Sequence, residues 1–74
     1  MTCREYLLRE AKTHQLCVIC SGGYIAETVW VDIKRNFKMS SELAKAKIVK
    51  IEAGTLPIYG PDGTIDVPCV YINT

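Results

Sequence analysis

The sequence predicts a small α+β domain with three helices and a three-stranded antiparallel sheet, in the order helix, strand, helix, helix, hairpin. Three observations predict this fold class. A short apolar run at 15–20 contains β-branched residues and stops at Ser21-Gly22-Gly23. Apolar residues recur with a helical period between 24 and 37. Two β-rich runs flank the turn signal Gly60-Pro61-Asp62-Gly63. With 74 residues and no internal repeat, residues 1–74 are expected to form one domain.

The first predicted helix runs from Thr2 to about Thr13, with Thr2 as its N-cap. Its apolar residues recur at helical spacing: Cys3, Tyr6, Leu7 and Ala11. The next segment, "QLCVIC", places five apolar residues in six positions. We therefore expect a short strand that is buried on both faces.

The second predicted helix covers "YIAETVWVDIKRNF", residues 24–37, and has the clearest helical pattern. One side of a wheel turning about 100° per residue carries its apolar residues, which are Ile25, Ala26, Val29, Trp30, Ile33 and Phe37. Val31 is the one large apolar residue on the polar side. The pattern places Trp30 and Phe37 in the core.

The third predicted helix runs from Ser41 to about Ala53, with Ser40 or Ser41 as its cap. Glu42 brings an acidic group to its first turn, and Gly54 follows where a left-handed C-terminal cap is wanted. The remaining segment, "TLPIYGPDGTIDVPCVYINT", predicts a β-hairpin. Pro57 and Pro68 lack a backbone donor, so we expect them at an edge or a bulge, with irregular pairing nearby.

Charge is unevenly distributed along the chain. The segment 34–50 contains only one acidic residue, Glu42, among its basic ones, which are Lys34, Arg35, Lys38, Lys45, Lys47 and Lys50. From Ile51 onward there is no basic residue, and the acidic residues there are Glu52, Asp62 and Asp66. This basic block, residues 34–50, allows two interpretations: a surface that binds nucleic-acid phosphates, or a solvated face of a helix.

The cysteines raise the question of a metal site. Cys17 and Cys20 could form a zinc knuckle with His14 and with Cys3 or Cys69. The intervening Val18-Ile19 favours extended backbone, which points the two thiols to opposite faces and favours buried cysteines without metal. Redox activity is less favoured, because the reactive cysteine of a Cys-x-x-Cys motif stands at the start of a helix, where its thiolate is stabilised, and not within a strand.

No pattern of residues specifies catalysis, because His14 has no recognisable triad around it. We therefore expect no enzymatic activity and no cofactor. The apolar runs are far shorter than the roughly 20 residues of a membrane span, and the N-terminal segment does not have the pattern of a secretory signal. These features predict a cytoplasmic protein with free thiols.

The segment "FKMSSELAKAKIVKIEAGTL" resembles the turn and recognition helix of the winged helix-turn-helix superfamily. Likewise, "PIYGPDGTIDVPCVYINT" resembles the two strands of the wing, and "CVIC" resembles the short first strand. The resemblance implies that the helix from Ser41 lies in the major groove of DNA. The residues it implies for DNA contact, on that helix or at phosphates, are Lys34, Arg35, Lys38, Ser40, Ser41, Lys45 and Lys47.

Two functions follow as hypotheses. The first is a DNA-binding regulator of transcription or of another DNA transaction, with a second copy of the chain as a further candidate partner. The second is a protein-interaction module, for example an inhibitor or modulator of a nucleic-acid-binding protein. In the second hypothesis the acidic hairpin contacts the partner through Tyr59, Asp62, Asp66 and Tyr71. The acidic hairpin favours the second hypothesis and the basic block favours the first.

Overall fold

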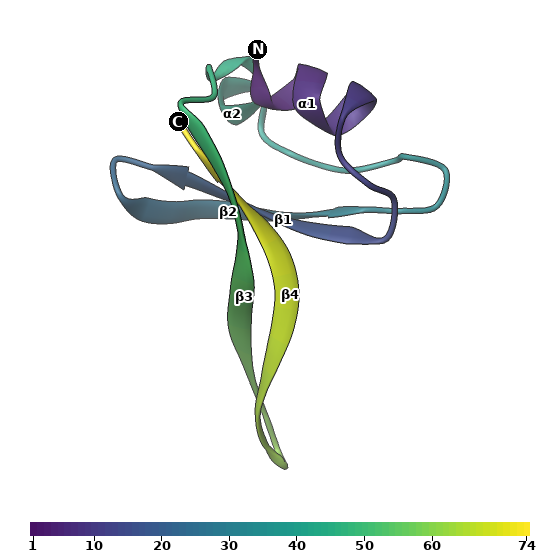
Figure 1. Cartoon of the computed structure of the whole chain (residues 1–74), viewed down its shortest axis with the longest axis vertical. Coiled ribbons are helices and arrows are strands. Elements are labelled where there is room, and N and C mark those ends of the chain that lie inside the picture. Colours follow the sequence, from purple (N-terminus) through teal and green to yellow (C-terminus); the bar gives the residue numbers. More distant parts are fainter.

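The computed structural model describes all 74 residues and contains two helices and four strands. The helices are α1 (Cys3–Arg9) and α2 (Ser41–Lys45), and the strands are β1 (Gln15–Ser21), β2 (Tyr24–Val31), β3 (Lys50–Gly60) and β4 (Gly63–Asn73). The strands form one sheet in the order β2-β1-β4-β3 (Figure 1). The central pair, β1 and β4, is parallel, and the outer pairs are antiparallel. The chain is α+β, but the predicted winged-helix fold with three helices and a three-stranded antiparallel sheet is wrong.

Helix α1 begins as the sequence predicted. The Thr2 hydroxyl accepts the backbone N–H of Glu5, and the Glu5 carboxylate accepts the N–H of Thr2, which together form a capping box. The helix ends at Arg9, earlier than expected, and its buried side chains are Cys3 and Leu7. These two side chains anchor α1 on the sheet.

Strand β1 confirms the prediction of a short strand buried on both faces. Cys17 and Ile19 belong to the cluster under the helices, whereas Val18 and Cys20 belong to a smaller cluster on the opposite face. The two cysteines of "CVIC" therefore point to opposite sides of the sheet, as extended backbone requires.

The predicted second helix, residues 24–37, does not form. Residues 24–31 are strand β2, which pairs antiparallel with β1. Gly22 and Gly23 both have positive φ, 61° and 85°, and make the two-residue turn between these strands. In β2, Val29 and Val31 are buried while Thr28 and Trp30 are exposed, which is the alternation of a half-buried strand. The pairing of β2 with β1 therefore outweighs the helical spacing of the apolar residues in this segment.

The predicted third helix, Ser41–Ala53, is mostly absent. Ser40 caps α2 as expected, because its hydroxyl accepts the N–H of Leu43, but the helix ends at Lys45. Strand β3 begins at Lys50, so Gly54 lies inside a strand and is not a helix C-cap. The β-branched residues at 48, 49 and 51 favour this extended conformation.

The predicted β-hairpin is confirmed as β3 and β4. Its register runs without a shift from Lys50↔Asn73 to Gly60↔Gly63, so the expected irregular pairing near Pro57 and Pro68 is wrong. Pro57 lies on β3, the edge strand of the sheet, where a missing donor is tolerated. The hairpin extends well beyond the other strands and contributes to an overall extent of 38 Å in the longest direction (Figure 1).

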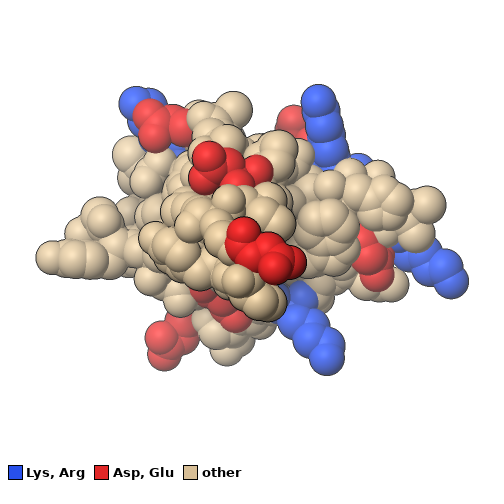
Figure 2. All heavy atoms as spheres, turned by 90° about the horizontal axis from the view of Figure 1, so that it is seen from below, with Lys and Arg blue, Asp and Glu red and all other residues tan.

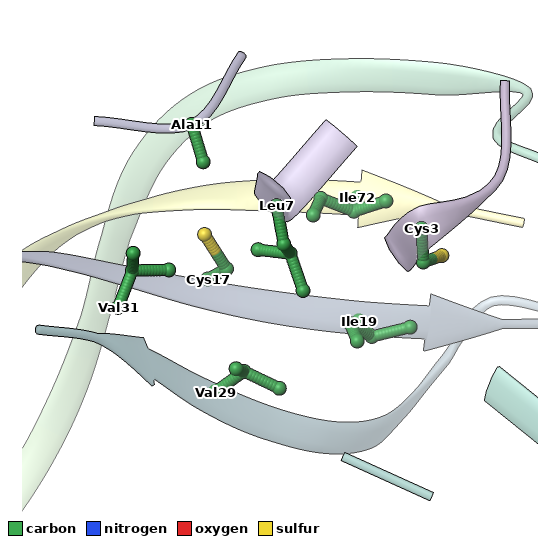
Figure 3. Packing of buried hydrophobic residues seen from close by; sticks show 8 residues of the cluster. All are labelled: Cys3, Leu7, Ala11, Cys17, Ile19, Val29, Val31 and Ile72. Carbon is green, nitrogen blue, oxygen red and sulfur yellow. The ribbon is translucent and has the colours of Figure 1, made fainter. Parts of the chain in front are cut away.

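The main core lies between the helices and one face of the sheet. Figure 3 shows Leu7 and Cys3 of α1 directed toward Cys17 and Ile19 of β1 and Ile72 of β4. Both helices lie on this side of the sheet, and no helix covers the other face (Figure 1). Neither helix has the length or the apolar content required to cross a bilayer.

Candidate functional site

The outer part of the β3–β4 hairpin stands apart from the rest of the sheet. Strand β1 pairs with β4 only from Cys69 to Asn73, so residues 55–68 have no third strand beside them. We call residues 55–68 the projecting arm (Figure 1). A two-stranded ribbon has only marginal stability of its own in water. The arm is therefore a feature that the fold exposes at some cost in stability.

One face of the projecting arm is apolar. Leu56 pairs with Val67, and Ile58 pairs with Ile65, so these four side chains lie on the same face. Ile58 is 47% exposed and Ile65 is 68% exposed. Tyr59, on the opposite face of the arm, is 81% exposed. The arm thus offers large apolar and aromatic side chains to solvent near its tip.

The arm is also acidic. Asp62 lies in the turn, Asp66 lies opposite Pro57 in the pairing, and the chain has no lysine or arginine after Lys50. Figure 2 views the molecule from the end at which the arm projects. Acidic groups lie near the centre of that view, and its margins carry both basic and acidic groups. The tip therefore combines apolar surface with negative charge.

Three of the four predicted partner-binding residues, Tyr59, Asp62 and Asp66, lie exposed on the arm. Tyr71 does not, because its hydroxyl donates to the Thr55 carbonyl at 2.6 Å and its ring lies over Gly54. Tyr71 thus fixes the base of the arm. Sequence reasoning missed Ile58 and Ile65, although counting outward from the turn pairs them and gives them one face.

The predicted DNA-contact residues do not form a helix-turn-helix surface. Helix α2 has five residues, about 7.5 Å of helix, which is too short to lie along a major groove as a recognition helix. Ser40 is engaged in capping, and its N–H donates to the Glu27 carboxylate at 3.1 Å. Four of the predicted residues line one surface pocket: Arg35, Lys38, Ser41 and Lys45. Lys34, Ser40 and Lys47 do not line it.

Arg35 has a structural role that the sequence did not indicate. Its guanidinium donates to the Leu7 carbonyl at 3.3 Å and also to the Ala11 carbonyl, so it ties the segment after β2 to the end of α1. Its φ of 62° is unusual for a residue other than glycine. A backbone conformation of this kind persists where surrounding contacts hold it.

The four cysteines are free and buried. Cys17 and Cys20 face opposite sides of the sheet, and nowhere do three or more His, Cys, Asp or Glu side chains gather in a way that could hold a metal ion. Burial raises the pKa of Cys17 to about 11, with a smaller contribution from Cys69. The thiol therefore stays protonated near neutral pH and behaves as an apolar core side chain.

Trp30 departs from its predicted place in the core. It is 51% exposed on the face of the sheet that no helix covers, and the His14 ring stacks on it with centroids 6.2 Å apart. Phe37 does pack against the main core, although it is only partly buried. The helical wheel failed for Trp30 because its segment is a strand.

No protein-family model, no curated protein and no solved structure matches this chain.

Proposed function

We propose that the protein is a binding module that docks on another protein through the projecting arm. The observation that carries this proposal is the exposure of Ile58, Tyr59 and Ile65 on a ribbon that the rest of the fold leaves unsupported. Large apolar side chains in such a position cost solubility and gain nothing for the core. Tyrosine is enriched at protein interfaces, and a contiguous exposed apolar patch marks an interaction surface.

The arm binds through its faces in this proposal, and not by adding a strand of the partner to its edges. Pro57 and Pro68 have no N–H to offer to an added strand, and one lies on each strand of the arm. A partner is therefore expected to receive the tip of the arm in an apolar groove, with Ile58 and Ile65 against one wall and Tyr59 against the other.

The charge of the arm indicates the chemistry of the partner. Asp62 and Asp66 are complemented by lysine or arginine at the rim of such a groove. Proteins that bind nucleic acids carry basic surfaces, so the proposed partner class is a nucleic-acid-binding protein whose basic surface the arm occupies. The alternative, a winged-helix DNA regulator, rested on a recognition helix from Ser41, and α2 is too short for that role.

An affinity capture with matched variants tests the proposal. Immobilised wild-type protein is expected to retain a partner from a lysate of the source cells, and Tyr59→Ala and Asp66→Lys are expected to lose it. Tyr24→Ala is the control for the first variant, because Tyr24 is 80% exposed but lies on β2, away from the arm. Glu42→Lys is the control for the second, since it makes the same change in charge on α2.

Two results contradict the proposal. One is retention of the partner by both arm variants. The other is equal loss of the partner in an arm variant and in its control, which would trace the effect to general surface change. Binding that weakens as salt increases, for a captured protein with a basic surface, supports the assigned chemistry.

A further inference from the structure

A surface pocket is lined by residues of both helices. Figure 1 shows α1 and α2 at the end of the molecule away from the tip of the projecting arm. The pocket is formed by α1, by the segment between β2 and α2, and by α2 itself. Its volume is about 660 Å³, within the range of roughly 300–1,000 Å³ that is typical of small-molecule sites. No residue of the arm lines the pocket, so the two surfaces can be tested separately.

Positive charge is concentrated in this pocket. Arg4, Arg35, Lys38 and Lys45 all line it, and none of its lining residues is acidic. The one ion pair of the structure, Lys50–Glu52, lies elsewhere, so these four side chains have no carboxylate partner. Like charges placed around one pocket repel each other, and a bound anion relieves that repulsion.

The carboxylates nearest the pocket wall accept backbone N–H groups: Asp32 accepts that of Asn36 at 2.7 Å, and Glu27 accepts that of Ser40 at 3.1 Å. Glu5 and Glu42 do not line it, and the Glu5 carboxylate is engaged by the N–H of Thr2 at 3.0 Å. The chain as a whole has a formal net charge of only +1, so the pocket is a local concentration of charge and not a reflection of a basic protein.

Arg35 gives the pocket a fixed cation. Its bonds to the Leu7 and Ala11 carbonyls hold the guanidinium in place, and they use one of its two terminal nitrogens. The other N–H groups of the planar guanidinium have no partner within the protein and suit the oxygens of a phosphate. Arg4, Lys38 and Lys45 are exposed and can adjust around a ligand.

The remaining walls of the pocket combine neutral donors with apolar surface. Ser41 and Asn36 provide hydroxyl and amide groups, while Phe37 and Met39 provide an apolar wall that the main core supports from behind. An anion alone has no use for this wall. A ligand that joins a phosphate to a flat aromatic group uses both parts, through charge at one side and stacking at the other.

We propose that this pocket binds a nucleotide, with its phosphate among Arg4, Arg35, Lys38 and Lys45 and its base against Phe37. The nucleotide is either free in solution or one unit of a single-stranded nucleic acid, since both present the same chemistry. This site differs from a helix-turn-helix surface. In that mode a protein helix enters a groove of DNA, whereas here the nucleotide, free or within a single-stranded nucleic acid, enters a pocket of the protein.

Binding titrations with three probes test the proposal: adenosine monophosphate, inorganic phosphate, and an oligothymidylate of about ten nucleotides. Adenosine monophosphate is expected to bind more tightly than inorganic phosphate. Lys38→Glu and Lys45→Glu are each expected to weaken nucleotide binding at least about fivefold. Lys47→Glu is the matched control, because Lys47 is exposed, belongs to the same basic block and does not line the pocket.

The salt dependence assigns the source of the nucleotide. An oligothymidylate that binds more tightly than the mononucleotide, with a log–log salt slope of about −2 or steeper, indicates a single strand that crosses the pocket. Equal affinity for the oligothymidylate and the mononucleotide indicates that the natural ligand is a free nucleotide. The variant Phe37→Leu, which keeps apolar packing, is expected to weaken nucleotide binding and leave phosphate binding unchanged.

Three results would overturn the proposal. They are the absence of nucleotide binding at millimolar concentration, an affinity for inorganic phosphate equal to that for the mononucleotide, and an effect of Lys47→Glu equal to that of Lys45→Glu. Because Lys38, Lys45 and Lys47 are all exposed, their variants are expected to fold, and circular dichroism checks this.

Discussion

A single glycine fixes how the projecting arm meets the sheet. A Cβ atom at Gly54 would lie 2.9 Å from Cε2 of the Tyr71 ring. That ring cannot swing aside without loss, because its hydroxyl donates to the Thr55 carbonyl. The absence of a side chain at 54 thus lets Tyr71 lie flat across the base of the arm and bond to its backbone.

The substitution Gly54→Ala is therefore expected to lower the free energy of unfolding by about 1–3 kcal/mol, the range for overpacking, as measured by urea denaturation. Gly60→Ala is the control in the same strand, since the nearest atom to its Cβ is 3.7 Å away and its φ is not positive. The control is expected to be neutral or slightly stabilising. Equal destabilisation by both variants would contradict the role assigned to Tyr71.

The candidate residues differ in how far the sequence could predict them. Tyr59, Asp62 and Asp66 could be placed on the hairpin because a turn and its flanking strands are encoded locally. The pocket could not be assembled in this way. Arg4 and Lys45 come from different helices, and their shared pocket depends on how α1 and α2 pack on the sheet.

At the scale of elements, the capped starts of α1 and α2, strand β1 and the hairpin were predictable, and the rest of residues 24–53 was not. Apolar residues three and four apart in 24–37 fit a helix, yet Val29 and Val31 also fit a strand with one buried face. The choice was settled by Gly22-Gly23, a two-residue hairpin turn that places 24–31 beside β1. The parallel pairing of β1 with β4 has no local signal at all.

The projecting arm and the centre of the sheet are expected to differ in local stability. Backbone amides at 56–67 have no third strand beside them, whereas β1 has a neighbour on each side. Native-state hydrogen exchange is therefore expected to be faster in the arm than at Cys17–Ile19. Equal protection would show that the arm has support in solution, for example from a second copy of the chain.

At the scale of the whole molecule, the sheet consists of two hairpins joined by a single strand pairing. β1–β2 and β3–β4 are each formed from neighbouring segments, and only the β1–β4 ladder joins them within the sheet. Ile72 lies opposite Ile19 on that ladder and is fully buried in the main core. The integrity of the domain thus depends on a short central contact.

The substitution Ile72→Ala is expected to cost about 2–5 kcal/mol, a large part of the roughly 4–11 kcal/mol that a domain of this size has. Trp30 fluorescence reports on β2, and the far-ultraviolet signal reports on the whole fold, so both are expected to change in one shared transition. Ile65→Ala, on the exposed arm, is the control and should cost much less. Separate transitions for the two probes would contradict a single cooperative unit.

The parallel central pair also determines the order in which this chain can fold. Leu16 and Cys69 are neighbours in the sheet although about fifty residues separate them in the sequence. The two hairpins close short loops and can form early, while the β1–β4 ladder must await a long closure and forms last. Until then one edge of β1, with its run of apolar side chains, is unpaired and open to other chains. Slow acquisition of the central ladder, and loss of material to aggregation at high protein concentration during refolding, are the consequences of this strand order.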